Sequence, residues 1–229
     1  MERLITAKQI HKLVGFQPKN ETIYQNAFVH KSGVRDVHLT SNERLEFIGD
    51  SVLNMIIAIY LYDKYPDENE GFLTRVRTKL VCTKGLAKLG GILNLGDYVI
   101  MSKLNLSNNH NRSPRILEDT FEALLGAVYL DRGLNDCFMF VSNLIERHLD
   151  FDEVVVDTNY KALILRYVHS NGLHEPKYDV TSEHGPDHAK MYTVKLVING
   201  NTISEGFSTS KKDAEQQASH RALRALFVI

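Results

Sequence analysis

A stretch from Asn42 to Tyr60 is apolar enough for a buried helix, yet it carries three acidic residues. Glu43, Glu46 and Asp50 stand at positions i, i+3 and i+7, which fall within about 60° of one another on a helix. Carboxylates that share one face repel each other, and burying them is costly unless a cation or hydrogen-bond donors compensate. Two interpretations follow: a solvated first turn in which acids favour the positive end of the helix, or one half of a cation site.

A second apolar stretch, from Ile116 to Leu130, carries Asp119 and Glu122 at i and i+3. It also contains small residues that would let another helix approach closely: Ala123, Gly126 and Ala127. Two such helices can direct four carboxylate side chains to one point. Carboxylate oxygens are the ligands that Mg²⁺ or Mn²⁺ prefer, whereas a cluster that lacks cysteine and is poor in histidine does not suit zinc. The two stretches together favour the cation site.

The segments ERLEFIGDSVL (43–53) and LEDTFEALLGAVYLDRG (117–133) resemble the two signature segments of the ribonuclease III family, which cleaves double-stranded RNA. They stand in the order expected of that family. The resemblance implies an all-α endonuclease domain in which Mg²⁺, or Mn²⁺ in its place, assists hydrolysis of a phosphodiester bond. It implies four catalytic metal ligands: Glu46, Asp50, Asp119 and Glu122.

Three further residues take roles from the same resemblance. Glu43 would support the active site from the outer shell. Glu70 matches the family's acid ahead of the glycine of its EGxL element, although DENEG (67–71) also suits a solvated turn. Phe47 matches an aromatic residue at the interface of the family's homodimers, with burial in the core as the alternative. A homodimer would set two metal sites across one duplex.

The C-terminal part changes period. A helix is expected over 160–170, alternating strands follow, Asn199-Gly200 predicts a tight hairpin turn, and a last helix is expected over 210–226. The segments KYDVTSEHGPDHAKMYTV (177–194) and STSKKDAEQQA (208–218) resemble a double-stranded-RNA-binding domain, which spans about 16 base pairs of A-form helix. The resemblance implies four RNA-binding residues: His188, Lys190, Lys211 and Lys212.

This second resemblance has departures. Leu165 and Arg166 stand where that family often has a Gln-Glu pair that contacts 2′-hydroxyls, and Ser208 replaces a common glycine. Minor-groove contact by the first helix is therefore less expected than the fold itself. The implied architecture is an all-α ribonuclease III endonuclease domain over 1–150, a linker over 151–157, and an α+β (α-β-β-β-α) RNA-binding domain over 158–229.

Within the first domain, the patterns predict helices over 4–14, 20–32, 72–93 and 134–149 besides the two acidic ones. The acidic helices are expected to end near Tyr65, before Pro66, and near Asp131, before Gly133. Residues 95–101 suggest an extended link and 102–115 a polar loop.

Charge alone would not reveal an RNA enzyme, because the net charge is −1. Residues 158–229 hold nine Lys and Arg against seven Asp and Glu (+2), and the remainder holds 18 against 21 (−3). No run of eighteen apolar residues is present, so no membrane partner is expected. Cys82 and Cys137 are isolated, which predicts reduced thiols and a cytoplasmic location, or a host's cytoplasm for a viral protein.

Two functions fit these patterns. The first is a homodimeric endoribonuclease that cuts double-stranded RNA and leaves 5′-phosphate and 3′-hydroxyl ends with short 3′ overhangs. The alternative is a catalytically weak protein of the same fold that binds and sequesters duplexes. Because all four metal-site acids are present in the sequence, the enzyme is favoured.

Overall fold

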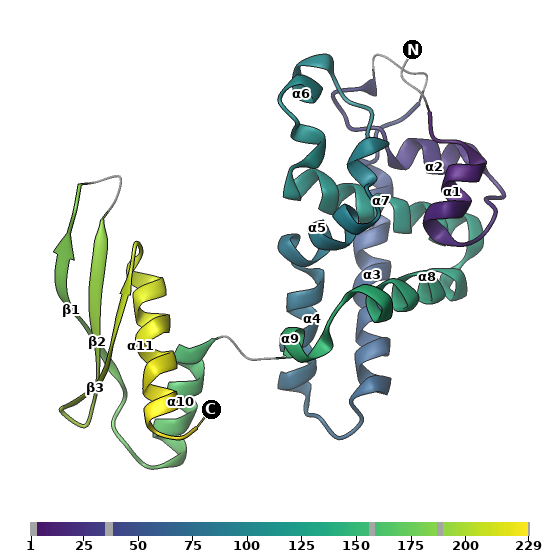
Figure 1. Ribbon diagram of the computed structural model, residues 1–229. Helices are drawn as coiled ribbons and strands as arrows, with labels where there is room; N and C mark the ends of the chain where they lie inside the picture. The colour runs from purple at the N-terminus through teal and green to yellow at the C-terminus, as the bar shows by residue number, and fades with distance from the viewer. Residues whose placement is uncertain (1–3, 35–38, 156–158, 187–189, 229) are drawn as a thin grey trace. The chain divides into compact units, whose positions relative to one another are not determined.

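The residues described by the computed structural model are 4–34, 39–155, 159–186 and 190–228. Contacts divide the chain into two compact units, Met1–Val155 and Val156–Ile229, here named the helical unit and the C-terminal unit. In Figure 1 the first is built of helices and the second combines a sheet with helices.

The helical unit has nine α-helices and two short 3₁₀ helices among its described residues. The α-helices are α1 (Ala7–Val14), α2 (Glu21–Ala27), α3 (Glu43–Lys64), α4 (Glu70–Val81), α5 (Thr83–Ile92), α6 (Lys103–Ser107), α7 (Pro114–Arg132), α8 (Leu134–His148) and α9 (Phe151–Val155). The 3₁₀ helices are η2 (Leu95–Asp97) and η3 (His110–Arg112).

Helices α3 and α7 form the centre of this unit and pack more extensively on each other than any other pair of elements. Two glycines allow the close approach. A Cβ on Gly49 would lie 1.8 Å from the carbonyl oxygen of Glu122, and one on Gly126 would lie 2.2 Å from that of Leu45. The predicted close contact at Gly126 is confirmed. By length and composition alone α3 could also cross a membrane, but here it is the central core helix.

The ends of both central helices lie close to their predicted positions. The last residue of α3 is Lys64, because Pro66 disfavours helix in the residue before it. At the other end of the pair, α7 stops at Arg132, where Gly133 adopts a φ of +86°. Phe121 of α7 and Phe28, which follows α2, are fully buried in one continuous apolar core.

Two predicted helices are wrong in their extent. The helix expected over 72–93 is divided at Cys82, whose ψ of 158° is extended, into α4 and α5. Gly85 permits the corner, since a Cβ there would lie 2.4 Å from the carbonyl oxygen of Leu80. The helix expected over 20–32 ends at Ala27. Beyond it, Val29 pairs with Ile100 in a short parallel bridge.

The stretches expected as an extended link and a polar loop contain short helical turns instead. Residues 95–101 begin with η2, and only the part around Ile100 is extended, where it meets Val29. Residues 102–115 hold α6 and η3. Such short turns are fixed by tertiary contacts rather than by periodicity. For example, Asn111 Nδ2 donates a hydrogen bond to Gly96 O at 2.9 Å.

Most of the predicted linker, 151–157, packs against the helical unit, as its run of three valines indicates. Residues 151–155 form α9, and Phe151, Val154 and Val155 pack against the core of the helical unit. Lys79 Nζ donates a hydrogen bond to Val154 O at 3.0 Å, which holds the last turn of α9 against α4. Residues 156–158 lie outside the described residues.

The C-terminal unit has the predicted order of helix, three strands and helix. Its elements are α10 (Tyr160–Ser170), β1 (Lys177–His184), β2 (Met191–Ile198), β3 (Asn201–Ser208) and α11 (Lys211–Ala225). The antiparallel sheet has the order β1-β2-β3. Asn199 and Gly200 have φ values of +51° and +79°, as a two-residue hairpin turn of the predicted kind requires.

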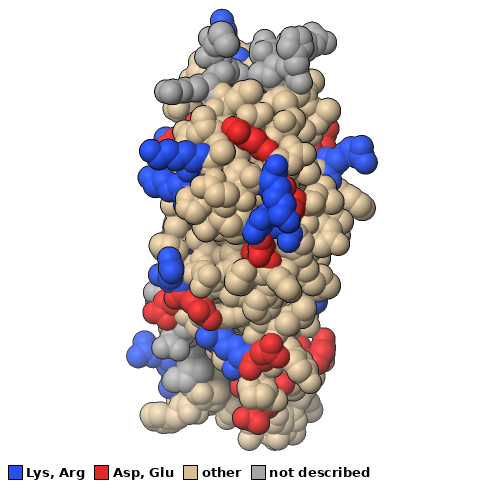
Figure 2. All heavy atoms as spheres, turned by 90° about the vertical axis from the view of Figure 1, so that its right-hand side faces the viewer, with Lys and Arg blue, Asp and Glu red and all other residues tan. Residues whose placement is uncertain are grey.

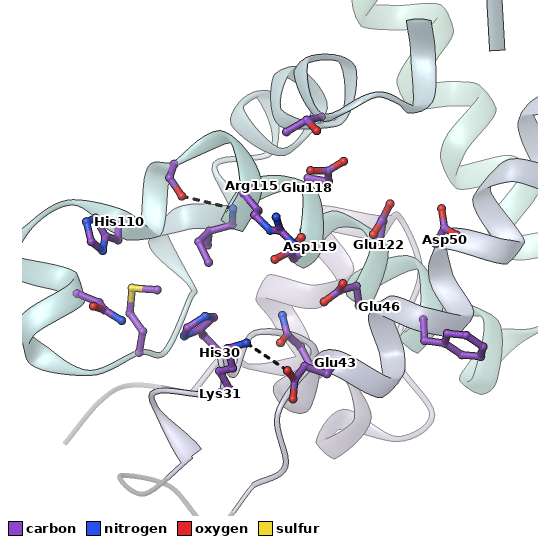
Figure 3. Close-up of a pocket in the computed structure, with 17 residues that line it drawn as sticks. His30, Lys31, Glu43, Glu46, Asp50, His110, Arg115, Glu118, Asp119 and Glu122 are labelled. Atoms are coloured by element: carbon purple, nitrogen blue, oxygen red, sulfur yellow. Dashed lines mark hydrogen bonds and ion pairs between the residues drawn. The ribbon is translucent and has the colours of Figure 1, made fainter. Parts of the chain in front are cut away.

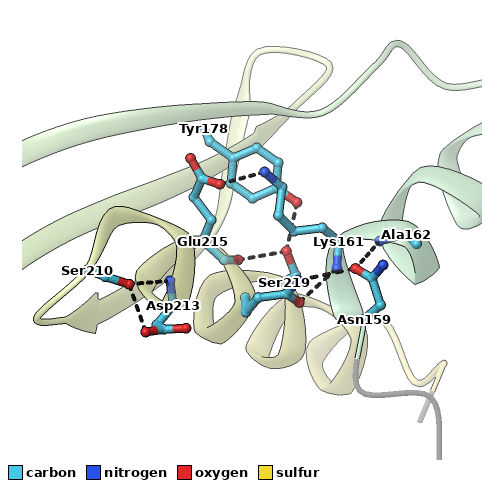
Figure 4. A network of polar contacts seen from close by, with 9 residues as sticks. Asn159, Lys161, Ala162, Tyr178, Ser210, Asp213, Glu215 and Ser219 are labelled. Atoms are coloured by element: carbon cyan, nitrogen blue, oxygen red, sulfur yellow. Dashed lines mark hydrogen bonds and ion pairs between the residues drawn. The ribbon is translucent and has the colours of Figure 1, made fainter. Parts of the chain in front are cut away.

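One face of the sheet is covered by α10 and α11 (Figure 1). Leu196 and Ile198 of β2 are buried against Ala218 and Ala222 of α11. A polar network joins the helices to β1 (Figure 4). In it Tyr178 Oη lies 2.7 Å from Ser219 Oγ, while Lys161 pairs with Glu215 and lies over the Tyr178 ring.

Charges of both signs are mixed on the surface. Figure 2 shows one face of the molecule, where lysine and arginine side chains lie among aspartates and glutamates with uncharged surface between them. This mixture agrees with the net charge of −1. A surface of this kind has no overall basic field to attract a polyanion, so any such binding would depend on local groups.

Candidate functional site

A cavity of about 1110 Å³ opens in the helical unit where the first half of α3 faces the first half of α7. Figure 3 shows its side chains, with a group of acids on the two helices and basic groups beside them. The acidic side chains among the described residues that line it are Glu43, Glu46, Asp50, Glu118, Asp119 and Glu122. The structure thus brings five predicted acids to one cavity and adds Glu118.

The close crossing of α3 and α7 explains this convergence. Gly49 lies between Glu46 and Asp50 in the chain and sits against the backbone of Glu122. The absence of a side chain at Gly49 lets the two helices meet where their acids are. Asp119 and Glu122 are three residues apart and therefore share one face of α7. The positions of the acids are consequences of backbone packing.

Glu122 is the most deeply placed of these acids, with a relative exposure of 8%. Burial raises its pKa from the ordinary 4.5 to about 8, because a charged carboxylate loses hydration there. Neighbouring carboxylates add to the rise, in decreasing order Asp50, Glu118, Glu46 and Asp119. A cation in the cavity would reverse both effects by favouring the ionised form.

Glu46 and Asp119 are half-buried, and burial is the main cause of the raised pKa of each. For Glu46 the nearby charges of Asp119 and Glu43 add to it. For Asp119 the positive charge of Arg115 acts in the opposite direction. The cavity therefore resists several simultaneous negative charges, which is the condition under which a divalent cation gains most.

Carboxylate oxygens are the donor type that suits a hard divalent cation, although these side chains do not converge on one point in the structure. Across the part of the chain that the structure describes, no three Asp, Glu, His or Cys side chains are grouped closely enough to hold a metal ion. Asp50 accepts a hydrogen bond from Asn54 Nδ2 at 2.8 Å, and Glu43 pairs with Lys31 at 3.5 Å. Both are exposed contacts that a cation could displace.

Glu70, the remaining predicted acid, does not line this cavity. It is exposed in the first turn of α4, where its Oε1 accepts a hydrogen bond from Thr74 Oγ1 at 2.9 Å. Within one chain the structure therefore does not bring Glu70 to the other acids, and its supporting role stays a prediction.

Phe47 is not a core residue, because 77% of its surface is exposed on α3. It lies at the edge of a second cavity of about 740 Å³. The apolar residues lining that cavity are Ile23, Leu45, Phe47, Ile48 and Leu130. Further along α3, Met55, Ile59 and Tyr62 are also exposed. An apolar side chain standing beside an apolar hollow is a feature that a second copy could cover.

Three of the four predicted RNA-binding residues, Lys190, Lys211 and Lys212, lie just before β2 and at the start of α11. Lys211 and Lys212 are exposed in the first turn of α11. Glu183 on β1 pairs with Lys190 at 3.0 Å and with Lys211 at 3.9 Å. His188 lies outside the described residues. On α10, Leu165 and Arg166 are both exposed.

Sequence reasoning missed several groups in the acidic cavity. Glu118 is four residues before Glu122 and so shares its helix face, a spacing that could have found it. Arg115, three residues before Glu118, lines the cavity from the same face of α7, and the same kind of spacing could have found it. His30 and Lys31 reach the cavity from the segment after α2, in AFVHKSG (27–33), and no periodicity connects that segment with α7.

Comparisons with known proteins agree with both units. A ribonuclease-III-like family model matches residues 20–149, and a double-stranded RNA binding motif model matches residues 160–226. Putative protein A464R of Paramecium bursaria Chlorella virus 1 is 40% identical over 225 residues, which cover 98% of this chain and 81% of that protein. Ribonuclease 3 of Staphylococcus aureus is 34% identical over 93% of this chain and 89% of its own.

Among solved structures, the nuclease domain of ribonuclease III from Campylobacter jejuni is 33% identical to this chain. It superposes with a TM-score of 0.59 over 63% of this chain and 99% of that domain. The similarity is thus one of sequence and of backbone arrangement.

Proposed function

Because this chain belongs to the ribonuclease III family and is an endoribonuclease of that type, we propose that it hydrolyses double-stranded RNA with a divalent metal ion at the acidic cavity. The observation that carries the proposal is the meeting of acids from α3 and α7 around one cavity, with Glu122 buried among them. The C-terminal unit, which matches a double-stranded-RNA-binding motif, delivers the duplex.

The four proposed ligands of Mg²⁺, or of Mn²⁺ in its place, are Glu46, Asp50, Asp119 and Glu122. Bound Mg²⁺ would lower the pKa of the attacking water and neutralise charge on the scissile phosphate and the leaving oxygen. The carboxylates position the reaction, Glu43 supports them from the rim, and no side-chain nucleophile is required. Cleavage in this way leaves a 5′-phosphate and a 3′-hydroxyl.

The proposed active form is a homodimer. Phe47 projects from α3 beside the apolar cavity that Leu45, Ile48 and Leu130 line. In a two-fold arrangement each copy offers the same surface, so Phe47 of one protomer can enter the hollow of the other. Two acidic cavities would then face opposite strands of one duplex, and their offset would give short 3′ overhangs.

Binding of the duplex would use Lys190, Lys211 and Lys212 toward phosphates, together with His188. The exposed lysines at the start of α11 support this, because phosphates are favoured at a helix N-terminus. Leu165 on α10 cannot donate a hydrogen bond to a 2′-hydroxyl. Phosphate contacts should therefore provide a larger share of the affinity, and binding should depend strongly on salt.

The decisive experiment is cleavage of end-labelled duplexes of defined length in Mg²⁺ or in chelator, with RNA binding measured in parallel by gel shift. We expect cleavage only with the metal, and loss of cleavage with retained binding in Glu122→Gln and Asp50→Asn. Glu68→Gln, an exposed acid outside the cavity, is the matched control. Cleavage that persists in both variants would show that the site is elsewhere; binding without any cleavage by wild type would favour the sequestering alternative.

A further inference from the structure

The wall of the acidic cavity next to the carboxylates is basic. His30 and Lys31 line it from the segment after α2, and Arg115 lines it from the first turn of α7 (Figure 3). A phosphodiester that approaches this group of acids is repelled unless positive charge or hydrogen-bond donors compensate. These three groups therefore help to decide where a phosphate can rest, beside the cation that the acids would hold.

The ring of His30 is held in one orientation by Ser32. Ser32 Oγ lies 2.8 Å from His30 Nδ1. The same Oγ accepts hydrogen bonds from Ser102 N and from Asn105 Nδ2, each at 3.1 Å, so its own proton is available for Nδ1. Ser32 N also donates to Nδ1 at 3.2 Å. With Nδ1 accepting, the proton of the neutral ring is on Nε2.

The backbone beneath His30 is fixed as well. His30 N donates to Ile100 O at 2.9 Å, and Ile100 N donates to Phe28 O at 2.8 Å. Gly33 packs so tightly that a Cβ there would lie 2.7 Å from Ile100 O. The segment that carries His30 is thus anchored to residues about seventy positions later in the chain. Anchoring of both ring and backbone is what a preorganised hydrogen-bond donor needs.

We propose that His30 donates its Nε2 proton to a non-bridging oxygen of an RNA phosphate in the strand being cut, beside Lys31 and Arg115, and that Ser32 is the positioning residue for this contact. The proposal rests on the proposed function, since the phosphate belongs to its substrate. Lys31 assists as a movable charge, because its 3.5 Å pair with Glu43 is exposed on both sides and exchanges readily with phosphate.

The test compares side-chain variants in single-turnover cleavage at saturating duplex. His30→Asn can keep the contact to Ser32 through its amide oxygen but has no donor where Nε2 lies, whereas His30→Gln places an amide nitrogen near that position. We expect cleavage to slow about 10- to 100-fold in His30→Asn, as for loss of a hydrogen bond to a charged group, and to recover in part in His30→Gln. Ser32→Ala should give a smaller loss. His11→Asn, an exposed histidine outside the cavity, is the control.

A second measurement separates a phosphate contact from a merely structural effect. Duplexes that carry one uncharged methylphosphonate at successive positions near the cleavage site are cut by wild type and by His30→Asn. At the contacted position the modification should slow wild type strongly and the variant little, because the donor is already missing. Equal penalties in both proteins at every position would overturn the proposal, as would wild-type rates for His30→Asn. Wild type that leaves an unmodified duplex intact in Mg²⁺ would instead refute the proposed function, and this contact with it.

Discussion

Replacing Glu122 by glutamine should stabilise the metal-free protein at neutral pH while it removes cleavage. In the native state burial raises the pKa of Glu122 to about 8, whereas the unfolded chain returns it to the ordinary 4.5. Between these two values the native state holds a proton that the unfolded chain releases. Stability is therefore lost as the pH rises through this range, and the loss is complete above about pH 8.

The size of the effect follows from the same pKa values. A difference of one pKa unit corresponds to about 1.36 kcal/mol. At pH 7 the free energy of unfolding of wild type is therefore about 3 kcal/mol lower than it would be with a fully protonated side chain at this position. Glutamine resembles that protonated form and avoids the loss. For a chain of this size the gain corresponds to an increase in Tm of about 6–12 °C.

The assay is thermal unfolding of wild type and Glu122→Gln in chelator from pH 5 to 8.5. The curves should converge near pH 5 and separate as the pH rises, and Mg²⁺ should stabilise wild type more than the variant. Glu68→Gln, an exposed acid outside the cavity, should show no widening gap. If Glu122→Gln has the same Tm as wild type at pH 8, the carboxylate is hydrated and the argument from burial is refuted.

Gly49→Ala should lower the free energy of unfolding by more than about 2 kcal/mol and abolish cleavage, because its Cβ would lie 1.8 Å from a backbone carbonyl oxygen. Urea unfolding measures the loss of stability, and Gly91→Ala, which has open space around it, should be neutral or stabilising. An equal loss of stability in both variants would contradict the role of the helix crossing. Phe47→Asp should convert the proposed homodimer to monomer in sedimentation equilibrium, and an unchanged dimer mass would place the interface elsewhere. Lys211→Ala and Lys212→Ala should each weaken duplex binding for all sequences and reduce the slope of log affinity against log salt by about one; a slope unchanged in both would remove them from the phosphate contacts.

Elements with a strong local signal were predictable from the sequence. The apolar periodicity of α3 and α7 fixes both helices, and Pro66 and Gly133 mark their ends. The Asn199-Gly200 turn sets the hairpin between β2 and β3. In each case the deciding interaction lies within a few residues in the chain, so pattern and structure agree.

Elements that depend on distant contacts were not predictable. The corner at Cys82 requires Gly85 to pack on a carbonyl, and a continuous helical pattern gives no sign of it. The helix α9 forms within the predicted linker because Lys79 and the core hold it there. The run of valines indicates packing but does not indicate the partner. The orientation of His30 depends on Ser32, whose hydrogen-bond partners are Ser102 and Asn105. These residues follow Ile100, which pairs with Val29 in the parallel bridge.

The acidic cavity combines both cases. Spacing alone places Asp119 and Glu122 on one face, and Gly49 and Gly126 bring that face to α3, so the backbone positions follow from sequence. The side chains still stand apart within the described residues. Two like charges 4 Å apart near a protein surface repel by about 4 kcal/mol, which no hydrogen bond in the cavity offsets on its own. Lys31 and Arg115 line the same cavity, yet the carboxylates still stand apart. We therefore expect the proposed divalent cation to complete the assembly, a step that neither the spacing of the acids nor the backbone packing can provide.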